Sequence, residues 1–185
     1  MRTPMAKSTK RNINLTGWGL LLSGVLFSAP TLAANWWYVE AGASRARINA
    51  VNTDFNPVLP RLKLGFILTP QIMFEAQYAG QGDDTVANTK IEVDSISAFY
   101  LRLDSGFRSD MRMYVLLGGA DTELTASTAS GSNPVSDSYS DSSWGIGLES
   151  RIWTKRTLLT LEYTEYYNHG DVTISATSLG FKFEF

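Results

Sequence analysis

The chain has no cysteine, a single histidine and no second long hydrophobic run beyond its N-terminal segment. Without cysteine, an exported chain must be stable without disulfides. With only His169 available, a zinc site built from several Cys and His ligands is excluded. A transmembrane helix needs about 20 apolar residues, so a helical membrane protein is excluded as well. If the protein crosses a membrane it must do so as a closed barrel, because only helices and closed barrels satisfy all backbone polar groups in lipid.

The N-terminal segment has the order of features that defines a secretory signal peptide. Basic residues without any acidic residue occupy residues 1–12, and a short apolar run follows at residues 15–29. Small residues come next, which predicts cleavage after Ala33 or Ala34. The apolar run is too short for a comfortable membrane span, so we prefer a signal peptide at residues 1–34 to a retained anchor. The rest of the chain, residues 35–185, is then one domain.

This mature part is acidic and contains no recognisable cofactor motif. All 18 acidic residues lie in it, whereas part of the 16 basic residues lies in the signal peptide. This charge balance argues against a nucleic-acid partner. The carboxylates at residues 83–84 and 136–143 lack the spaced ligands of a calcium loop, and no glycine-rich phosphate motif occurs. We therefore expect no cofactor-binding residue and no metal-binding residue.

The mature part reads as strands separated by turns. Eight segments have period-two patterning or a composition rich in β-forming residues, namely residues 36–44, 61–68, 71–79, 91–103, 111–124, 142–153, 157–168 and 172–185. Three connections are brief, whereas those at residues 45–60 and 125–141 are long and polar. Short turns at one end and long loops at the other are typical of an outer-membrane barrel. The sequence predicts an all-β, eight-stranded, antiparallel up-and-down transmembrane barrel with both termini at the periplasmic end.

The two faces of these strands differ in polarity. Successive side chains of a strand point to opposite faces, so the apolar parity of each strand can be taken as the face toward lipid. Apolar residues of that face include Phe74, Leu101 and Phe181. The opposite parity predicts these charged residues for the barrel interior: Glu40, Lys63, Glu75, Asp94, Arg102, Glu149, Arg151, Glu162, Lys182 and Glu184. Such side chains are seldom buried unless they are paired, and a polar interior offers them partners.

Aromatic residues gather near the strand ends, as in the two aromatic girdles of outer-membrane barrels. We place Trp36, Trp37, Phe99 and Phe185 at the periplasmic level and Tyr78, Trp144, Tyr166 and Tyr167 at the outer level.

Two segments do not fit the simple alternation. In residues 111–124 both parities are apolar, so the orientation of Tyr114 and Val115 stays open, and Arg112 is placed near the membrane interface. In residues 172–178 the apolar residues have the wrong parity for the end of the strand. That segment either projects above the membrane or contains a β-bulge, which shifts the register.

Several of these stretches resemble the small outer-membrane β-barrel family of the eight-stranded OmpA and OmpX type. They are the signal peptide, WWYVEAGAS at residues 36–44, YVLLGGA at residues 114–120 and LGFKFEF at residues 179–185. The resemblance implies a location in the outer membrane, in contact with membrane lipid and lipopolysaccharide. It also implies that Phe181, Phe183 and Phe185 form the C-terminal signal read by the outer-membrane assembly machinery; the alternative is an ordinary amphipathic closing strand.

The function is less defined than the fold. The long polar loops favour a non-enzymatic barrel, with no catalytic residue, that serves envelope structure or binds a host or cell-surface ligand. The alternative is that the loops are solvated caps without a ligand. A narrow channel is opposed by the charged interior, because eight strands leave a lumen that side chains can fill. A lipid A-modifying enzyme would have to use His169, with Asp171 or a serine nearby. A soluble periplasmic lipid-binding barrel would bury the aromatic face instead.

Overall fold

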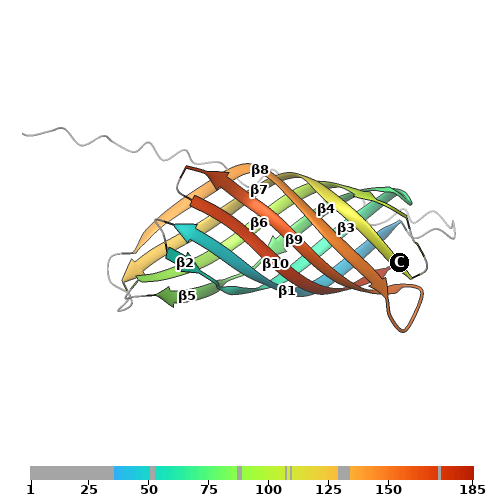
Figure 1. Cartoon of the computed structure of the whole chain (residues 1–185), viewed down its shortest axis with the longest axis horizontal. Helices are drawn as coiled ribbons and strands as arrows, with labels where there is room; N and C mark the ends of the chain where they lie inside the picture. Colours follow the sequence, from blue (N-terminus) through green and yellow to red (C-terminus); the bar gives the residue numbers. More distant parts are fainter. Residues whose placement is uncertain are drawn as a thin grey trace, which may run out of the picture. The chain divides into compact units, whose positions relative to one another are not determined.

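The chain folds into a closed barrel of antiparallel strands (Figure 1). The computed structural model describes residues 36–185 except 51–52, 87–88, 107, 109, 129–133 and 171, so the predicted signal peptide and its cleavage site lie outside the described residues. Each long strand pairs with the next one along the chain, and the last pairs with the first. These strands are β1 (Trp37–Ala50), β3 (Val58–Thr69), β4 (Ile72–Ala79), β6 (Thr89–Asp104), β7 (Met111–Thr128), β8 (Val135–Arg151), β9 (Thr157–His169) and β10 (Val172–Glu184). The predicted eight-stranded up-and-down barrel is confirmed. None of the described residues belongs to a helix long and apolar enough to span a membrane.

The strands are longer than the sequence indicated, because the predicted long loops are largely strand. β1 continues to Ala50, and two short strands, β2 (Thr53–Phe55) and β5 (Gly82–Val86), pair with β1 and β6. β7 and β8 remain paired from Met111↔Ser150 as far as Ala126↔Val135. The polar residues of these stretches form strands because each has a cross-strand neighbour to bond with, a contribution that composition does not reveal. Serine-rich residues 135–141 therefore belong to β8 and not to a loop.

The two ends of the barrel are different. The brief connections β3–β4, β6–β7 and β8–β9 lie at one end, together with the C-terminus (Figure 1). Phe185 donates its backbone N–H to the carbonyl of Trp37 there, at 3.0 Å, so the first and last strands meet. β2 and β5 lie at the opposite end (Figure 1). We call these the periplasmic and the extracellular end.

The faces of the barrel follow the predicted polarity. Phe74, Phe181 and other large apolar side chains are exposed on the outside, whereas charged side chains are buried within the barrel. In β7, Tyr114 points inward with 2% of its surface exposed and Val115 outward with 41%, which resolves the orientation that the sequence left open. Arg112 is buried inside the barrel and not placed on the lipid side. Tyr38 and Tyr114 fit inside because they lie over Gly65 and Gly147, where an added Cβ would come within 2.1 Å of each ring.

The interior has two zones, of which the sequence predicted only one. Toward the periplasmic end it is filled by charged and hydroxyl-bearing side chains. Toward the extracellular end it is apolar, and we call this group the distal apolar cluster: Ile48, Phe55, Leu59, Val93, Ile96, Leu124 and Ile174. Three of them, Ile48, Phe55 and Leu59, come from the segment predicted as a long loop, and they pack on inward-facing apolar side chains of the other strands. The extracellular end is consequently stabilised by hydrophobic burial as a soluble β-sandwich would be.

Three register shifts occur between the described strands, one of them between Ile67 and Thr69 beside the β3–β4 turn. The second lies in the β9–β10 pair, where Tyr166 of β9 is the extra residue. β10 itself stays in continuous register with β1, and Ile174 faces the interior with the same parity as Lys182, so the bulge that was one of the two explanations for residues 172–178 is wrong. The third shift, between Val93 and Ser95 in the β6–β7 pair, was not predicted. The extra residue there changes the parity of β6, because Val93 and Ile96 both face the interior.

One aromatic assignment needs correction. The side chain of Tyr166 is 1% exposed, so it does not lie on the lipid face. Its hydroxyl oxygen accepts a hydrogen bond from the side-chain amide of Gln77 inside the barrel. Tyr166 has the same parity in β9 as Glu162, so it faces the interior. Trp144 and Tyr163, with ring centroids 6.0 Å apart, are exposed on the outside near the extracellular level.

Candidate functional site

The largest polar grouping in the described residues is a network of ionised side chains inside the periplasmic half of the barrel. We call it the lumenal network, and its members are Glu40, Arg61, Lys63, Glu75, Arg102, Asp104, Arg112, Glu149, Glu162, Lys182 and Glu184. Every barrel strand except the short β2 and β5 contributes to it or borders it, because inward positions alternate along each strand. The lumen is therefore bridged by ion pairs between opposite walls.

Glu162 in β9 is one centre of this network. Its carboxylate receives hydrogen bonds from Arg61 Nη1 at 2.7 Å and from the hydroxyl of Tyr114 at 2.7 Å, and it also pairs with Lys63. Arg61 turns its other terminal nitrogen to Glu40 Oε1 at 2.7 Å, which continues the chain of charges to β1. The pairs join β3 to β9 across the barrel.

Glu149 in β8 is the second centre. Its Oε2 accepts hydrogen bonds from Lys182 at 2.9 Å and from Arg112 Nε at 2.7 Å, and its Oε1 forms an ion pair with Arg102 Nη1 at 2.8 Å. Aromatic faces add further stabilisation, since the guanidinium of Arg102 lies 3.6 Å from the ring centroid of Tyr114. Cations held over an aromatic ring in a site without water are attracted by its quadrupole.

The network includes most of the predicted interior charges, together with three residues that the prediction left out. Glu40, Lys63, Glu75, Arg102, Glu149, Glu162, Lys182 and Glu184 are all buried inside the barrel. Arg61 and Asp104 could have been found, because they share the parity of Lys63 and Arg102 at the ends of the same strands. Arg112 could not, because both faces of its strand are apolar. It forms ion pairs with Glu184 at 2.6 Å and with Asp104 at 3.0 Å.

The other two predicted interior charges are not members of the lumenal network. Asp94 is the extra residue of the β6 bulge and accepts a hydrogen bond at 2.7 Å from Thr125, whose hydroxyl also contacts the exposed Ser136. The bulge thus moves Asp94 away from the lumenal network. Arg151, the last residue of β8, is half-buried and lines the periplasmic mouth of the barrel with Arg112 and Glu184.

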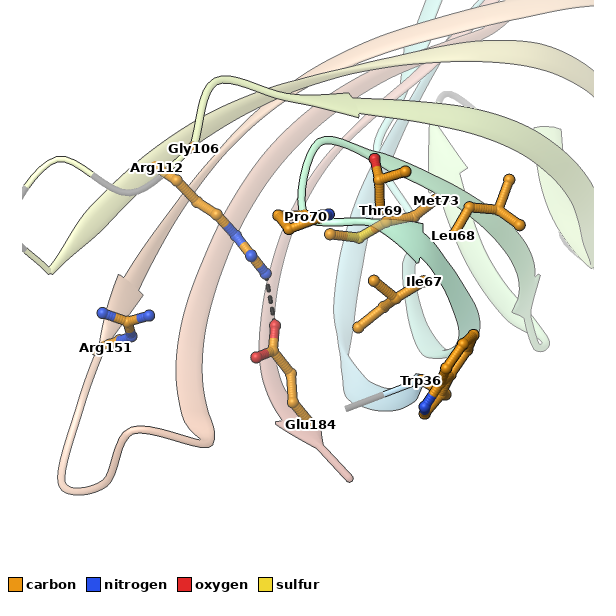
Figure 2. Close-up of a pocket in the computed structure, with 10 residues that line it drawn as sticks. All are labelled: Trp36, Ile67, Leu68, Thr69, Pro70, Met73, Gly106, Arg112, Arg151 and Glu184. Carbon is orange, nitrogen blue, oxygen red and sulfur yellow. Dashed lines mark hydrogen bonds and ion pairs between the residues drawn. The ribbon is translucent and has the colours of Figure 1, made fainter. Parts of the chain in front are cut away.

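The periplasmic mouth of the barrel is a cavity of about 380 Å³ (Figure 2). Trp36, Ile67 and Met73 form its apolar wall, and the Arg112–Glu184 ion pair lies opposite (Figure 2). This ion pair and the rest of the lumenal network lie between the cavity and the distal apolar cluster. The cavity is thus the open end of a filled barrel.

His169 is the residue on which an enzyme would depend. It lies at the extracellular end of β9, highly exposed, with Nδ1 2.8 Å from Asp141 Oδ2. The hydrogen bond from His169 lowers the pKa of Asp141. Tyr139 and Tyr167 pack edge to face beside this pair, with ring centroids 5.1 Å apart. These side-chain contacts connect β8 to β9 on the extracellular side of Trp144↔Glu165, where the backbone pairing of the two strands ends. The other predicted partner, Asp171, lies outside the described residues.

The carboxylates of the extracellular end make local contacts. Asp84 accepts the backbone N–H of Asn56 at 2.7 Å, and Asp83 lies 3.5 Å from the ammonium of Lys90. No group of three or more potential metal ligands occurs among the residues that the structure describes.

The C-terminal aromatic residues all lie on the outside of the barrel. Phe185 stacks on Trp37 at the β1–β10 closure, with ring centroids 4.3 Å apart and an interplanar angle of 12°. Phe183 packs edge to face on Phe185 at 5.0 Å, and Phe181 stacks on Trp153 at 6.2 Å. The terminal phenylalanines are therefore part of the periplasmic aromatic girdle.

Comparison with known proteins agrees with this architecture. No curated protein sequence matches the chain. Ail, the attachment invasion locus protein of Yersinia pestis, is 15% identical, covering 82% of this chain and 100% of its own, with a TM-score of 0.62. Neisserial surface protein A is 17% identical, covering 80% and 97%, with a TM-score of 0.65. The N-terminal barrel of Pseudomonas aeruginosa OprF is 17% identical, covering 82% and 98%, with a TM-score of 0.59. At these identities the likeness concerns the fold.

The family comparison is more specific. The model of the outer membrane protein β-barrel domain matches residues 19–185, which is most of the chain. The outward aromatic side chains and the polar lumen of the closed barrel agree with the general features of outer-membrane barrels. The chain belongs to the outer membrane protein β-barrel domain family, and it is a protein of the outer membrane.

Proposed function

We propose that this protein is a non-enzymatic surface barrel that presents its acidic extracellular end to protein ligands on other cells or in the surrounding matrix. The observation that carries the proposal is the continued pairing of β6, β7 and β8 beyond the aromatic girdle. β7 and β8 stay paired through Ala126↔Val135, and the distal apolar cluster supports them from inside. A rigid scaffold that displays polar surface is well suited to recognition.

The charge of this extension indicates the kind of ligand. Asp121 and Glu123 lie on its outward face, and Asp137 and Asp141 lie on the part of β8 beyond the β8–β9 ladder. Among the described residues, the only ion pair of these four carboxylates is that of Asp141 with His169 of β9. Electrostatic complementarity favours a basic protein surface over a sulfated polysaccharide. Ail has been crystallised with the heparin analogue sucrose octasulfate, so heparin is the natural contrasting probe.

The alternatives have less support. The lumenal network fills the barrel with ion pairs, which opposes ion conduction through eight strands. The described contacts of His169 are with Asp141 and the ring of Tyr167, and a hydrolase would also need a nucleophile within hydrogen-bond reach.

The proposal is tested with a charge-neutralised variant, Asp121→Asn, Glu123→Gln and Asp137→Asn together. Bacteria that display it should bind less to cultured cells and to coatings of basic matrix protein, with less dependence on salt. Asp110→Asn, at a periplasmic turn, is the matched control and should bind as the parent does. Binding to cells and matrix that is equal in all three strains would refute the proposal, as would stronger binding to heparin than to basic protein.

A further inference from the structure

The outward face of β1 changes character at one position. From Trp37 the outward residues are apolar through Ala43, and the next two are Arg45 and Arg47. Both arginines are exposed, and the residues on either side of Arg45, Ser44 and Ala46, are fully buried, so these guanidinium groups point away from the barrel.

The position of the arginines along the strand places them at the outer membrane boundary. A strand rises about 3.3 Å per residue and is tilted by about 40°, so each residue gains roughly 2.5 Å of height. From Trp37 in the periplasmic girdle, Arg45 is then about 20 Å and Arg47 about 25 Å away, which matches an apolar band of about 25 Å. In register, Arg45 is opposite Thr177 of β10, which is opposite the outer girdle residue Tyr163 of β9. The two guanidinium groups therefore lie at the level of the outer-leaflet headgroups.

The protein supplies only part of the negative charge that these arginines need. Arg47 forms an ion pair with Asp54 of β2 at 2.8 Å, although 62% of its side chain remains exposed. For Arg45, none of the described residues accepts a hydrogen bond or forms an ion pair. Its nearest polar neighbour in register is the hydroxyl of Thr177. This surface, Arg45, Arg47 and Thr177, has two cations and one adjacent carboxylate, so it carries a net positive charge.

The side of the barrel opposite β1 has the reverse charge. Asp121 of β7, four strands away from β1, is exposed on the outside there, opposite Ser140 of β8. A second carboxylate, Glu165 of β9, is nearer, because it is opposite Ser175 of β10, which is in turn opposite Arg47. Its oxygen already accepts hydrogen bonds from the indole N–H of Trp144 and the side-chain amide of Asn168, each at 3.2 Å. An anionic headgroup is therefore repelled at β7 and attracted to the arginines of β1.

We infer that Arg45, Arg47 and Thr177 form a seat for a phosphate group of outer-leaflet lipid, with the acyl chains lying along the apolar face of β1 and β10 below. Guanidinium groups bind phosphate through two parallel charge-assisted hydrogen bonds, and a threonine hydroxyl can donate a third. Ala41, Ala43 and Leu179 are the outward residues directly beneath, and the two alanines leave room for an acyl chain beside the strand. The best match is lipid A, because it combines phosphate monoesters with several acyl chains. This inference concerns lipid alone and stands apart from the proposed binding of protein ligands.

The experiment titrates the full folded barrel in detergent micelles with bisphosphorylated lipid A, enzymatically dephosphorylated lipid A and inorganic phosphate, using native mass spectrometry. Bisphosphorylated lipid A should bind, and Arg45→Gln should weaken it by about tenfold, the loss expected for a hydrogen bond to a charged group. Arg45→Lys should show an intermediate loss, because it keeps the charge but not the paired donors. Arg156→Gln, in the exposed β8–β9 turn at the other end, is the matched control and should bind like the parent.

Three results would overturn the inference: equal binding of dephosphorylated lipid A, unchanged binding in both Arg45→Gln and Arg47→Gln, or an equal loss in Arg156→Gln. Inorganic phosphate that competes at the same concentration as lipid A would also overturn it, because the acyl chains would then contribute nothing. Gel mobility before and after boiling checks that each variant is folded. Should Arg45→Gln fail to fold, Arg47→Gln and Arg45→Lys decide the outcome in its place.

Discussion

Removing the charge of Glu149 should destabilise the barrel strongly. Its carboxylate forms ion pairs with Arg102, Lys182 and Arg112 at 2.7 to 2.8 Å, all inside the lumen. In Glu149→Gln, Arg102 keeps Asp104 at 2.7 Å and Arg112 keeps Glu184 at 2.6 Å. Lys182 keeps one ion pair among the described residues, with Glu184 at 3.6 Å, and lies 4.0 Å from the ring centroid of Tyr38. Breaking a buried ion pair by removing one partner costs about 3 to 5 kcal/mol, and the loss of compensation at Lys182 places this variant within that range.

The free energy of unfolding is measured by reversible urea unfolding from lipid vesicles, with tryptophan fluorescence and gel mobility as independent probes. Glu123→Gln is the matched control, because the exposed Glu123 has only a weak contact with Ser95 at 3.5 Å and should change stability by no more than about 0.5 kcal/mol. Adding Lys182→Met to Glu149→Gln should recover part of the loss, since it removes the cation with the weakest remaining partner. A cost below about 1 kcal/mol for Glu149→Gln would refute the reasoning and indicate a solvated lumen.

Three further substitutions test other parts of the structure. Leu161→Arg, on the outside of β9 where the neighbouring strands are also apolar, should cost about 2 to 4 kcal/mol in the same urea assay. Phe185→Ala removes the stack on Trp37 and should cost about 0.5 to 1.5 kcal/mol beyond the lost burial, and it should slow insertion in an assembly assay if Phe185 is part of the assembly signal. His169→Ala should raise the pKa of Asp141 back toward its ordinary value in an NMR carboxyl titration, because the hydrogen bond from His169 lowers it. Since that pKa is lowered in the folded state, the stabilisation from this contact is present at neutral pH and is lost as the pH falls through the folded-state pKa.

The barrel itself could be predicted because period-two alternation assigns each side chain to one of two faces. Lys63, Glu75 and Glu162 alternate with apolar residues, so their strands could be oriented without any knowledge of tertiary contacts. The same rule would have placed Tyr166 inside, had it been applied in place of the preference of tyrosine for the membrane interface. Where both parities are apolar, as around Arg112, the rule cannot decide which face points inward. In the structure the ring of Tyr114 lies over Gly147 inside the barrel, and this packing identifies the internal face.

The alternation of polarity, and therefore the closed barrel with its lipid face outward, was determined by the sequence, because each strand alone specifies which of its faces is apolar. Only the tertiary structure decided which charges meet across the lumen, since the pairing of Arg61 with Glu162 depends on how the sheet curves and closes. It also decided that the strands continue beyond the membrane around an apolar cluster. That cluster draws Ile48, Leu124 and Ile174 from distant parts of the chain, so no single segment shows it.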